Sequence, residues 1–157
     1  MAGAVGKKDD RKALARNKKA RHDYDLDGSL EAGIVLTGSE VKSLRDGQAS
    51  LVDAHVEARG GELWLVGAQI PPYPFAHGQN HEPRRNRKLL VHKREVRRLE
   101  TKVREKGVSI IPLEIYAARG LIKVEIALGR GRREYEKRDA QRTKEAQREM
   151  DAARRPR

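Results

Sequence analysis

The sequence predicts a mainly β domain, a small closed antiparallel barrel with helices packed against it and a basic C-terminal tail. Three observations lead to this fold class. Several short segments are β-branched or alternate apolar and polar residues. Tight turns at Gly60-Gly61 and Arg119-Gly120 join two pairs of them. Few stretches have helical periodicity, and a small curled sheet avoids open edges by closing on itself. An open α+β sandwich is the structural alternative.

The first predicted elements are a strand, a short helix and a hairpin. Residues 31–38 are apolar, β-branched and bounded by glycine, as is typical of a buried strand. Ser39 can cap a short helix that Gly47 ends. Residues 50–59 alternate with a period of two, and residues 62–70 return as their partner strand. The apolar side of the first hairpin strand consists of Val52, Ala54, Val56 and Ala58.

A long loop and a helix precede the last two strands. Residues 71–88 are rich in proline, glycine and asparagine, and a loop of this length inside a compact domain is usually functional or disordered. Residues 87–91 fit either a short strand or one helical turn. Residues 93–107 predict a helix that Gly107 ends, and residues 108–118 and 121–129 predict the closing strands. The apolar stripe of the helix consists of Val96, Leu99 and Val103.

Charge is unevenly distributed along the chain, which carries a net charge of +12. Residues 1–23 contain eight Lys/Arg against three Asp, and residues 130–157 contain eleven Lys/Arg against six Asp/Glu. Between them, residues 24–82 are net acidic while residues 83–106 are strongly basic. Such segregation favours a polyanionic partner, because Lys and Arg neutralise phosphates and release counterions.

These shifts in composition predict three parts: a basic N-terminal arm (1–23), a barrel (24–129) and a basic tail (130–157). From Tyr135 onwards, the tail favours helix but has only Tyr135 and Met150 as large apolar residues. A helix with so little to bury is not stable alone, so we expect the tail to be disordered when free and helical on its partner.

The sequence does not predict an enzyme, a cofactor or a metal site. It has no nucleophile elbow, no Walker phosphate loop and no dinucleotide-binding glycine motif. His77 and His81 lie in a loop without a third clustered ligand, and the chain has no cysteine. It also has no run of 18 apolar residues and no signal-peptide pattern, so we expect no membrane partner and a cytoplasmic location.

Two segments are candidates for RNA binding. NKKARHDY (17–24) interleaves cations with asparagine, histidine and tyrosine, which can reach phosphates and stack on unpaired bases. EPRRNRK, at 82–88, packs four cations into five residues just before a basic helix entry. Aromatic residues make up only 4% of the chain, so a multi-ring stacking platform is not expected and recognition should rest on shape and backbone contacts.

Four stretches of the sequence resemble the SsrA-binding (SmpB) proteins. They are NKKARHDY, EAGIVLTGSEVKSLRDGQASLVDAHV, HEPRRNRKLLVHKREV and ALGRGRREYEKR with its basic tail. The resemblance covers roughly residues 14–150 in unbroken order. It implies an oligonucleotide-binding (OB)-like barrel in a bacterial RNA-binding adaptor. Such adaptors bind the tRNA-like domain of transfer-messenger RNA (SsrA) and deliver it to stalled ribosomes for trans-translation.

The resemblance also implies partners and site residues. The partners are transfer-messenger RNA, the small-subunit decoding centre and message channel of the ribosome and, indirectly through the RNA, elongation factor Tu and alanyl-tRNA synthetase. The protein replaces the missing anticodon arm, while the tail enters the empty message channel. The RNA-binding residues are Asn17, Lys18, Arg21, His22, Glu31, Arg84, Arg87, Lys88, Leu90, His92 and Lys123. The ribosome-binding tail residues are Gly131, Tyr135, Glu136, Lys137, Arg138, Arg142, Lys144 and Arg148. Glu136 stands where the family typically has Asp.

A small basic ribosomal or ribosome-assembly protein that binds ribosomal RNA is the alternative function. Basic termini on a near-neutral body suit this class equally well. Only the four motif stretches favour the adaptor.

Overall fold

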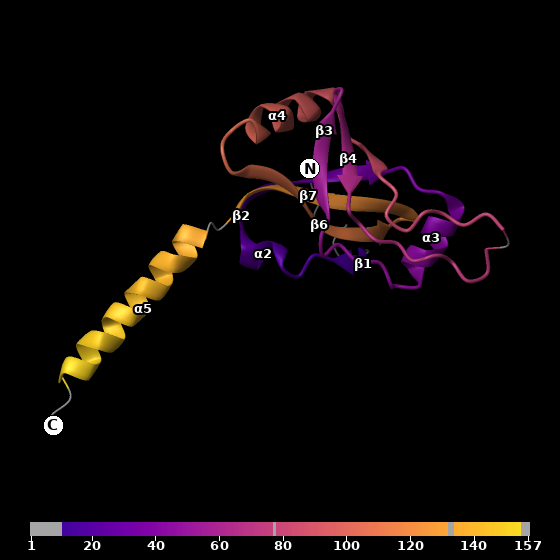
Figure 1. Ribbon diagram of the computed structural model, residues 1–157. Helices are drawn as coiled ribbons and strands as arrows, with labels where there is room; N and C mark the ends of the chain where they lie inside the picture. The colour runs from indigo at the N-terminus through magenta and orange to yellow at the C-terminus, as the bar shows by residue number, and fades with distance from the viewer. Residues whose placement is uncertain (1–10, 77, 132–133, 155–157) are drawn as a thin grey trace.

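The computed structural model describes residues 11–76, 78–131 and 134–154, and within the last helix it describes side chains for residues 143–153. Within these residues, seven antiparallel strands follow the order β1–β6–β3–β4–β5–β2–β7, and a β6–β7 pairing closes the ring (Figure 1). The predicted closed antiparallel barrel is therefore confirmed. The strands are β1 (Lys12–Arg16), β2 (Tyr24–Ile34), β3 (His55–Arg59), β4 (Glu62–Val66), β5 (Arg87–Leu90), β6 (Val108–Ala118) and β7 (Leu121–Gly131). The helices are α2 (Ala20–Asp23), α3 (Gly38–Arg45), α4 (Lys93–Val103) and α5 (Glu134–Arg154).

Three long, bent strands close the barrel. β2, β6 and β7 each contain 11 residues. Their pairings shift register between Asp27 and Leu30 and between Pro112 and Glu114, and such bulges bend a strand. Where β7 crosses close to its neighbours, a Cβ added at Gly129 would lie 2.9 Å from the Ile111 side chain, so only glycine fits.

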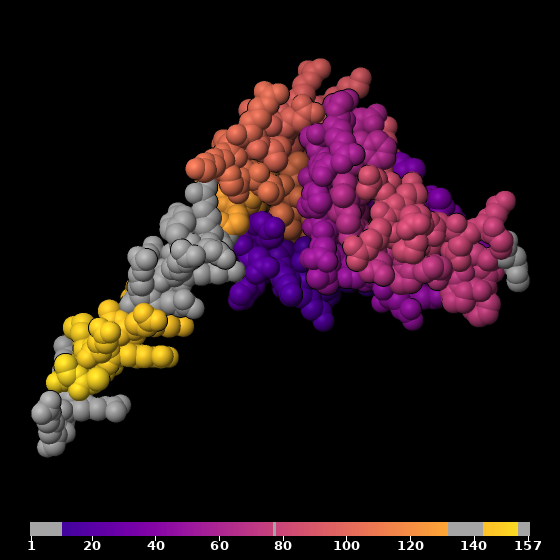
Figure 2. Space-filling model, in the orientation of Figure 1, coloured from indigo at the N-terminus to yellow at the C-terminus, as the bar shows by residue number. Residues whose placement is uncertain are grey.

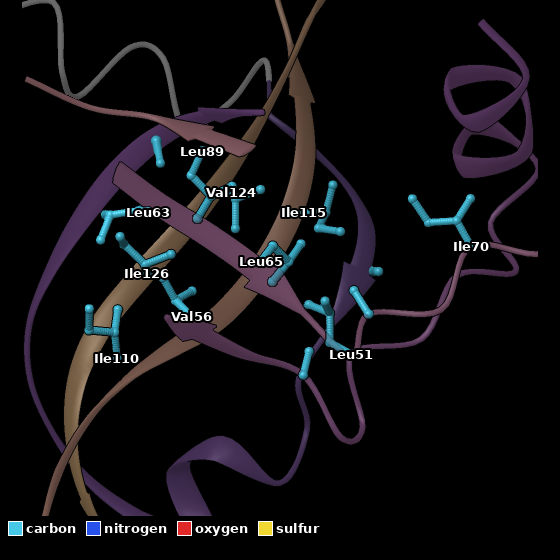
Figure 3. Packing of buried hydrophobic residues seen from close by; sticks show 14 of the residues in the cluster. Leu51, Val56, Leu63, Leu65, Ile70, Leu89, Ile110, Ile115, Val124 and Ile126 are labelled. Carbon is cyan, nitrogen blue, oxygen red and sulfur yellow. The ribbon is translucent and has the colours of Figure 1, made fainter. Parts of the chain in front are cut away.

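The barrel interior is filled by aliphatic side chains from every closing strand (Figure 3). Leu63 and Leu65 of β4 face Ile115 of β6 and Val124 and Ile126 of β7, and all five are fully buried. α4 covers one side of the barrel with Val96 and Leu99, as its predicted stripe requires, while Val103 is half-buried. Burial of each such side chain contributes on the order of 1.5–3 kcal/mol.

Both predicted tight turns are present. Gly60 and Gly61 have φ of 57° and 77°, and they join Arg59 to its cross-strand partner Glu62. Arg119 and Gly120 have φ of 53° and 75°, and they join β6 to β7. Positive φ at both central residues matches the twist of a two-residue hairpin, which is why glycine occupies three of these four positions.

The first strand and helix are shifted from their predicted bounds. β2 runs from Tyr24 to Ile34 rather than over 31–38, and Val35 is already 45% exposed. The cap of α3 is Thr37, so the prediction of Ser39 as the cap is wrong. The Thr37 hydroxyl accepts a hydrogen bond from the Glu40 backbone N–H, and the Glu40 carboxylate accepts one from the Thr37 N–H. This capping box fixes where the chain leaves the sheet.

The strand predicted at 50–59 begins only at His55. Leu51 is buried and Val52 is 61% exposed, so the prediction that Val52 faces the core is wrong. The Ala54 N–H donates to the Leu51 carbonyl in a turn, and this turn reverses the side-chain alternation before β3 starts. Val56 and Ala58 follow the predicted pattern.

The segment at 87–91, which fitted either strand or helix, forms β5 over Arg87–Leu90. It pairs with β4 on one side and with β2 on the other, and this double pairing decides in favour of the strand. α4 ends at Val103 rather than at Gly107. Gly107, with φ of 82°, instead lies in the turn that leads into β6.

Part of the expected N-terminal arm belongs to the sheet. Residues 12–16 form β1, which pairs antiparallel with β6 and buries Leu14 and Ala15. The boundary at residue 23 therefore does not separate an arm from the barrel over these residues. The apolar run Ala13–Ala15 inside a basic segment is the sequence signal for this strand.

α5 extends away from the barrel as a single helix (Figure 1). Its described side chains, from residues 143–153, are all exposed, and Figure 2 shows this yellow part of the tail clear of the barrel. Burial against the barrel does not hold these residues, which agrees with the predicted disorder of the tail when free. Helix is the conformation that we expect for the tail on its partner.

Candidate nucleic-acid interface

Three of the predicted RNA-binding residues gather on one outer face of the barrel. Gly33 of β2 pairs with Leu90 of β5 on one side and with Lys123 of β7 on the other. Glu31 lies two residues before Gly33 and therefore points to the same face. Leu90 is 52% exposed although it is aliphatic. We call the surface of Glu31, Leu90 and Lys123 the barrel face.

Tyr116 orients the carboxylate of this face. It pairs with Lys123 across β6 and β7, and its hydroxyl donates a hydrogen bond to Oε2 of Glu31. Burial of the ring, together with the Glu31 carboxylate, raises the pKa of Tyr116. The hydroxyl therefore remains a donor at physiological pH and holds Glu31 in one orientation. A carboxylate fixed in this way can accept hydrogen bonds from base amino groups.

Arg11 neutralises two further carboxylates next to the barrel face. Its guanidinium carbon lies 3.6 Å from the ring centroid of Tyr116. The Arg11 Nε and Nη1 atoms donate to Glu114 Oε1 at 3.0 Å and Glu125 Oε2 at 3.2 Å. Without this cation, two carboxylates would repel an approaching phosphate. Sequence reasoning missed both Arg11 and Tyr116, because their proximity depends on the pairing of β1 with β6.

Arg87, which was predicted to lie near the phosphates, is completely buried. Its Nε atom donates to Oε2 of Glu40, and its Nη1 atom donates to the Ala68 carbonyl at 3.0 Å. Its Nη2 atom reaches the Pro83 carbonyl at 3.1 Å. The guanidinium is thus fully engaged inside the protein, and the expectation of a phosphate contact does not fit this burial. Arg87 instead fastens the long loop to α3.

Glu40 is the centre of this buried cluster. It also accepts a 2.6 Å hydrogen bond from Nη2 of Arg85 and one from the Thr37 backbone N–H. Burial alone would raise the pKa of Glu40, but the hydrogen bonds from Arg85, Thr37 and Arg87 lower it to about 2. One carboxylate therefore both caps α3 and pairs with two arginines.

The loop between Gly67 and Asn86 is held by two further side chains. The Asn80 amide donates to the Tyr73 carbonyl at 2.9 Å, and its oxygen accepts from the Tyr73 N–H at 3.0 Å. His81 is buried and bridges the Ser39 hydroxyl and the Ile70 carbonyl, each at 2.8 Å. His81 therefore has a structural role. In the described part of the chain, no group of three or more His, Cys, Asp or Glu could hold a metal ion.

The remaining predicted cations of this region reach the surface. Arg84 is exposed, and Lys88 is partly exposed with its Nζ atom 3.1 Å from Oε1 of Glu62. A solvent-exposed pair of this kind contributes only about 0–1 kcal/mol, so Lys88 can exchange Glu62 for a phosphate at little cost. A groove between the β3–β4 turn, β5 and α4 continues from the barrel face, and its lining includes Lys88, Leu90, Lys93 and Arg97.

His92 stands at the start of α4, beside this groove. It occupies the N-cap position and is exposed, but its side chain makes no capping hydrogen bond. The imidazole is thus not committed to the helix. His92 follows Leu90 by two residues where the chain passes from β5 into α4.

Around α2, the predicted residues divide between surface and framework. Lys18, Arg21 and His22 are exposed. Asn17 is half-buried, and its amide donates to the Pro112 carbonyl at 2.9 Å while its backbone N–H donates to Leu113. Asn17 therefore anchors the segment to β6, and this anchoring positions the exposed cations that follow.

The predicted tail residues lie mostly outside the side chains that the structure describes. This holds for Tyr135, Glu136, Lys137, Arg138 and Arg142. Gly131 is the last residue of β7 and pairs with Tyr24, so the tail starts directly at the barrel. Lys144 and Arg148 are exposed on α5.

No helix in the described part of the chain is long and apolar enough to cross a membrane. The combination of a closed antiparallel barrel, an outer face with Lys123 and Leu90, and a groove lined by cations defines a small nucleic-acid-binding barrel protein. A family model for the SmpB protein matches residues 14–156. The chain belongs to the SmpB family.

Relatives and a solved structure agree with this membership. The chain is 55% identical to the SsrA-binding protein of Acidothermus cellulolyticus, covering 91% of this chain and 90% of that protein. It is 52% identical to the SsrA-binding protein of Streptomyces avermitilis, covering 96% and 86%. A chain from the solved structure "tmRNA-SmpB: a journey to the center of the bacterial ribosome" superposes with a TM-score of 0.64 at 46% identity, covering 75% of this chain and 83% of that one.

We expect Arg87→Ala to lower the free energy of unfolding by about 3–5 kcal/mol, because it leaves Glu40 with one arginine in a buried site. Arg84→Ala is the matched control and should change this free energy by no more than about 0.5 kcal/mol, since Arg84 is exposed. Urea unfolding followed by circular dichroism measures both. Equal effects of the two substitutions would contradict the structural role of Arg87.

Glu40 also predicts a pH dependence. Its pKa is about 2 in the folded protein against an ordinary value of 4.5. Its ionised form therefore stabilises the fold above about pH 4.5, by roughly 3 kcal/mol, and this stabilisation is lost as the pH falls from about 4.5 to about 2. We expect the difference in unfolding free energy between the wild type and Glu40→Gln to shrink over this range. Glu82→Gln, at an exposed carboxylate, should show no comparable trend, and a constant difference for Glu40→Gln would refute the assignment.

Proposed function

We propose that this protein is a non-catalytic RNA-binding adaptor that binds the tRNA-like domain of transfer-messenger RNA and delivers it to stalled ribosomes for trans-translation. The observation that carries this proposal is the similarity to SsrA-binding proteins at about half identity over nine-tenths of the chain. The structural similarity to a chain from the solved tmRNA–SmpB structure supports it. The family resemblance implies that the protein takes the place of the missing anticodon arm.

The barrel face is the proposed contact with the tRNA-like domain. Lys123 supplies a cation, Leu90 supplies an exposed apolar surface, and Glu31 supplies an oriented acceptor. His92, Arg84 and Lys88 extend this contact along the loop and the groove beside α4. A surface of single cations with one carboxylate suits recognition of backbone and base edges in a folded RNA.

Two further parts of the chain are proposed to contact the ribosome. Lys18, just before α2, and Arg21 and His22 in α2 are exposed and are assigned to the decoding centre of the small subunit. The basic tail, from Gly131 through Arg148, is assigned to the message channel, where RNA walls take the place of an apolar partner. Glu136 retains the charge of the family's usual Asp on a longer side chain.

Partners follow from this assignment. Elongation factor Tu and alanyl-tRNA synthetase would meet the protein only through the RNA that both recognise. A protein that works on translating bacterial ribosomes acts in the cytoplasm, which we therefore propose as its location.

RNA co-purification tests the proposal against a small basic ribosomal protein. The protein is expressed with an affinity tag in a bacterium, and the bound RNA is sequenced after washes at increasing salt. We expect enrichment of a single RNA of a few hundred bases with a tRNA-like end. Stoichiometric recovery of ribosomal RNA alone would refute the proposal and favour the ribosomal alternative.

Salt dependence of binding tests the barrel face and groove directly. Lys123→Ala and Lys88→Ala should each lower the affinity for the tRNA-like transcript. Each should also reduce the slope of log K against log salt by roughly 0.7–0.9, because each removes one phosphate contact. Lys106→Ala, at an exposed lysine before β6, is the matched control and should leave the slope unchanged. Unchanged slopes for Lys123 and Lys88 would place the phosphates elsewhere.

A further inference from the structure

The long loop carries an exposed aromatic ring that neither the barrel face nor α2 uses. Phe75 is 72% exposed, whereas the other aromatic residues whose side chains the structure describes are half-buried or buried. Its ring meets Tyr73 edge to face, with centroids 5.6 Å apart and planes inclined by 66°. An edge-to-face pair leaves a ring face of Phe75 open to solvent. An exposed phenylalanine with no core function calls for a physical explanation.

Hydrogen bonds hold the backbone of the loop on either side of this ring. The Asn80 amide makes two hydrogen bonds to the backbone of Tyr73, at 2.9 Å and 3.0 Å. The Ala76 N–H donates to the Tyr73 carbonyl, which forms a turn around Phe75. His81 and Arg87 then tie the base of the loop to the protein body. A contact residue held in this way loses little conformational entropy when it binds a partner.

A lysine lies beside the aromatic pair, and two arginines lie further along the same loop. The Nζ atom of Lys42 lies 5.7 Å from the ring centroid of Tyr73. Arg84 is exposed in the same loop, and the Arg85 side chain is 35% exposed. Glu40 lies close by, but it is buried and neutralised by Arg85 and Arg87. An exposed ring among cations matches a nucleic acid, which presents flat bases together with phosphates.

The base of the loop lies next to β2 and β5, two strands of the barrel face. Arg85 Nη2 donates to the Val35 carbonyl at 3.3 Å, and the Val35 N–H donates to the Lys88 carbonyl at 2.9 Å. Lys88 is two residues from Leu90 on β5. In Figure 1 the loop and α3 lie at the end of the barrel opposite to α5. RNA on the barrel face therefore lies next to the base of the loop that carries Phe75.

We propose that Phe75, supported by Tyr73, is a stacking site for one unpaired base of the bound RNA. Lys42 and Arg84 would hold the adjoining phosphates, while Arg85 remains paired with Glu40. The inference rests on the proposed function for the identity of the RNA, and it adds a contact that is distinct from the barrel face. Sequence reasoning argued against a multi-ring platform because aromatic residues are few, but a single fixed ring is sufficient to stack one base.

Three variants of the full-length protein test the stacking. Phe75→Leu keeps an apolar side chain but removes the ring, and Phe75→Trp keeps a larger ring. Val52→Ala is the matched control, at a 61% exposed apolar residue outside the loop. Binding is measured with three RNAs: a transcript of the tRNA-like domain, a short unstructured single strand and a fully paired duplex. Thermal unfolding of each variant confirms that it is folded.

We expect Phe75→Leu to weaken binding of the transcript and of the single strand about 5- to 150-fold, the range for the loss of one stacked base. The salt slope should not change, since no cation is removed. Binding of the duplex by Phe75→Leu should not change. Phe75→Trp should bind the transcript and the single strand at least as tightly as the wild type does. The single strand should quench the fluorescence of the added tryptophan. Val52→Ala should behave as wild type.

Two results would overturn the inference. One is unchanged affinity of Phe75→Leu for both the transcript and the single strand, which would assign the ring to another class of partner. The other is an equal loss with the duplex or in Val52→Ala, which would indicate a general effect. Failure of the wild type to prefer the transcript over the duplex would instead refute the proposed function. In that case, the affinities of the wild type and Phe75→Leu for the single strand would still test whether Phe75 stacks on a base.

Discussion

The buried carboxylate of Glu40 is the interaction on which the arrangement of the RNA-binding surfaces depends. It caps α3 through Thr37, pairs with Arg87 at the start of β5 and pairs with Arg85 in the long loop. The start of α3 and the stretch from Arg85 to Arg87 thus share one anion, although these arginines lie 45 and 47 residues from Glu40 in the sequence. A buried carboxylate is costly unless it is fully paired, so the loop, the helix and the strand have to be placed together. This cluster therefore also fixes the backbone positions of the surface cations next to it.

Charge on the molecule is divided between groups that hold the fold and groups that face solvent. Arg11 and Arg87 form salt bridges within the protein. Arg11 pairs with Glu114 and Glu125, and Arg87 pairs with Glu40. At the surface, Lys88 has an exchangeable partner in Glu62, and Lys123 lies on the barrel face. Net charge therefore overstates the number of groups that can meet phosphates. Within the acidic stretch, Glu40 is neutralised by Arg85 and Arg87, and Glu31 is oriented by Tyr116, so these two carboxylates do not bar RNA from the barrel face.

Sequence periodicity was sufficient for the barrel but not for the roles of its cations. The two hairpins could be predicted because glycine and alternation act locally, and β6 has the predicted bounds. Arg84 and Arg87 are three residues apart in one basic run, yet one is exposed and the other fully buried. Arg87 is buried because β5 pairs with β2 and β4, and this pairing joins residues far apart in the sequence. β1 and the Arg11–Tyr116 contact were missed for the same reason, since both depend on pairing with β6 across about a hundred residues.

The same physics explains why the barrel and the tail differ so much in their relation to a partner. The barrel face is organised before binding, because Tyr116 fixes Glu31 and strand pairing fixes Leu90 and Lys123. A preorganised surface loses little entropy on binding and suits an RNA of defined shape. In α5, residues 143–153 bury nothing, so its helix has to gain stability from what surrounds it. In the proposed function, RNA walls supply this stabilisation, so the order of the tail is coupled to its arrival in the empty channel.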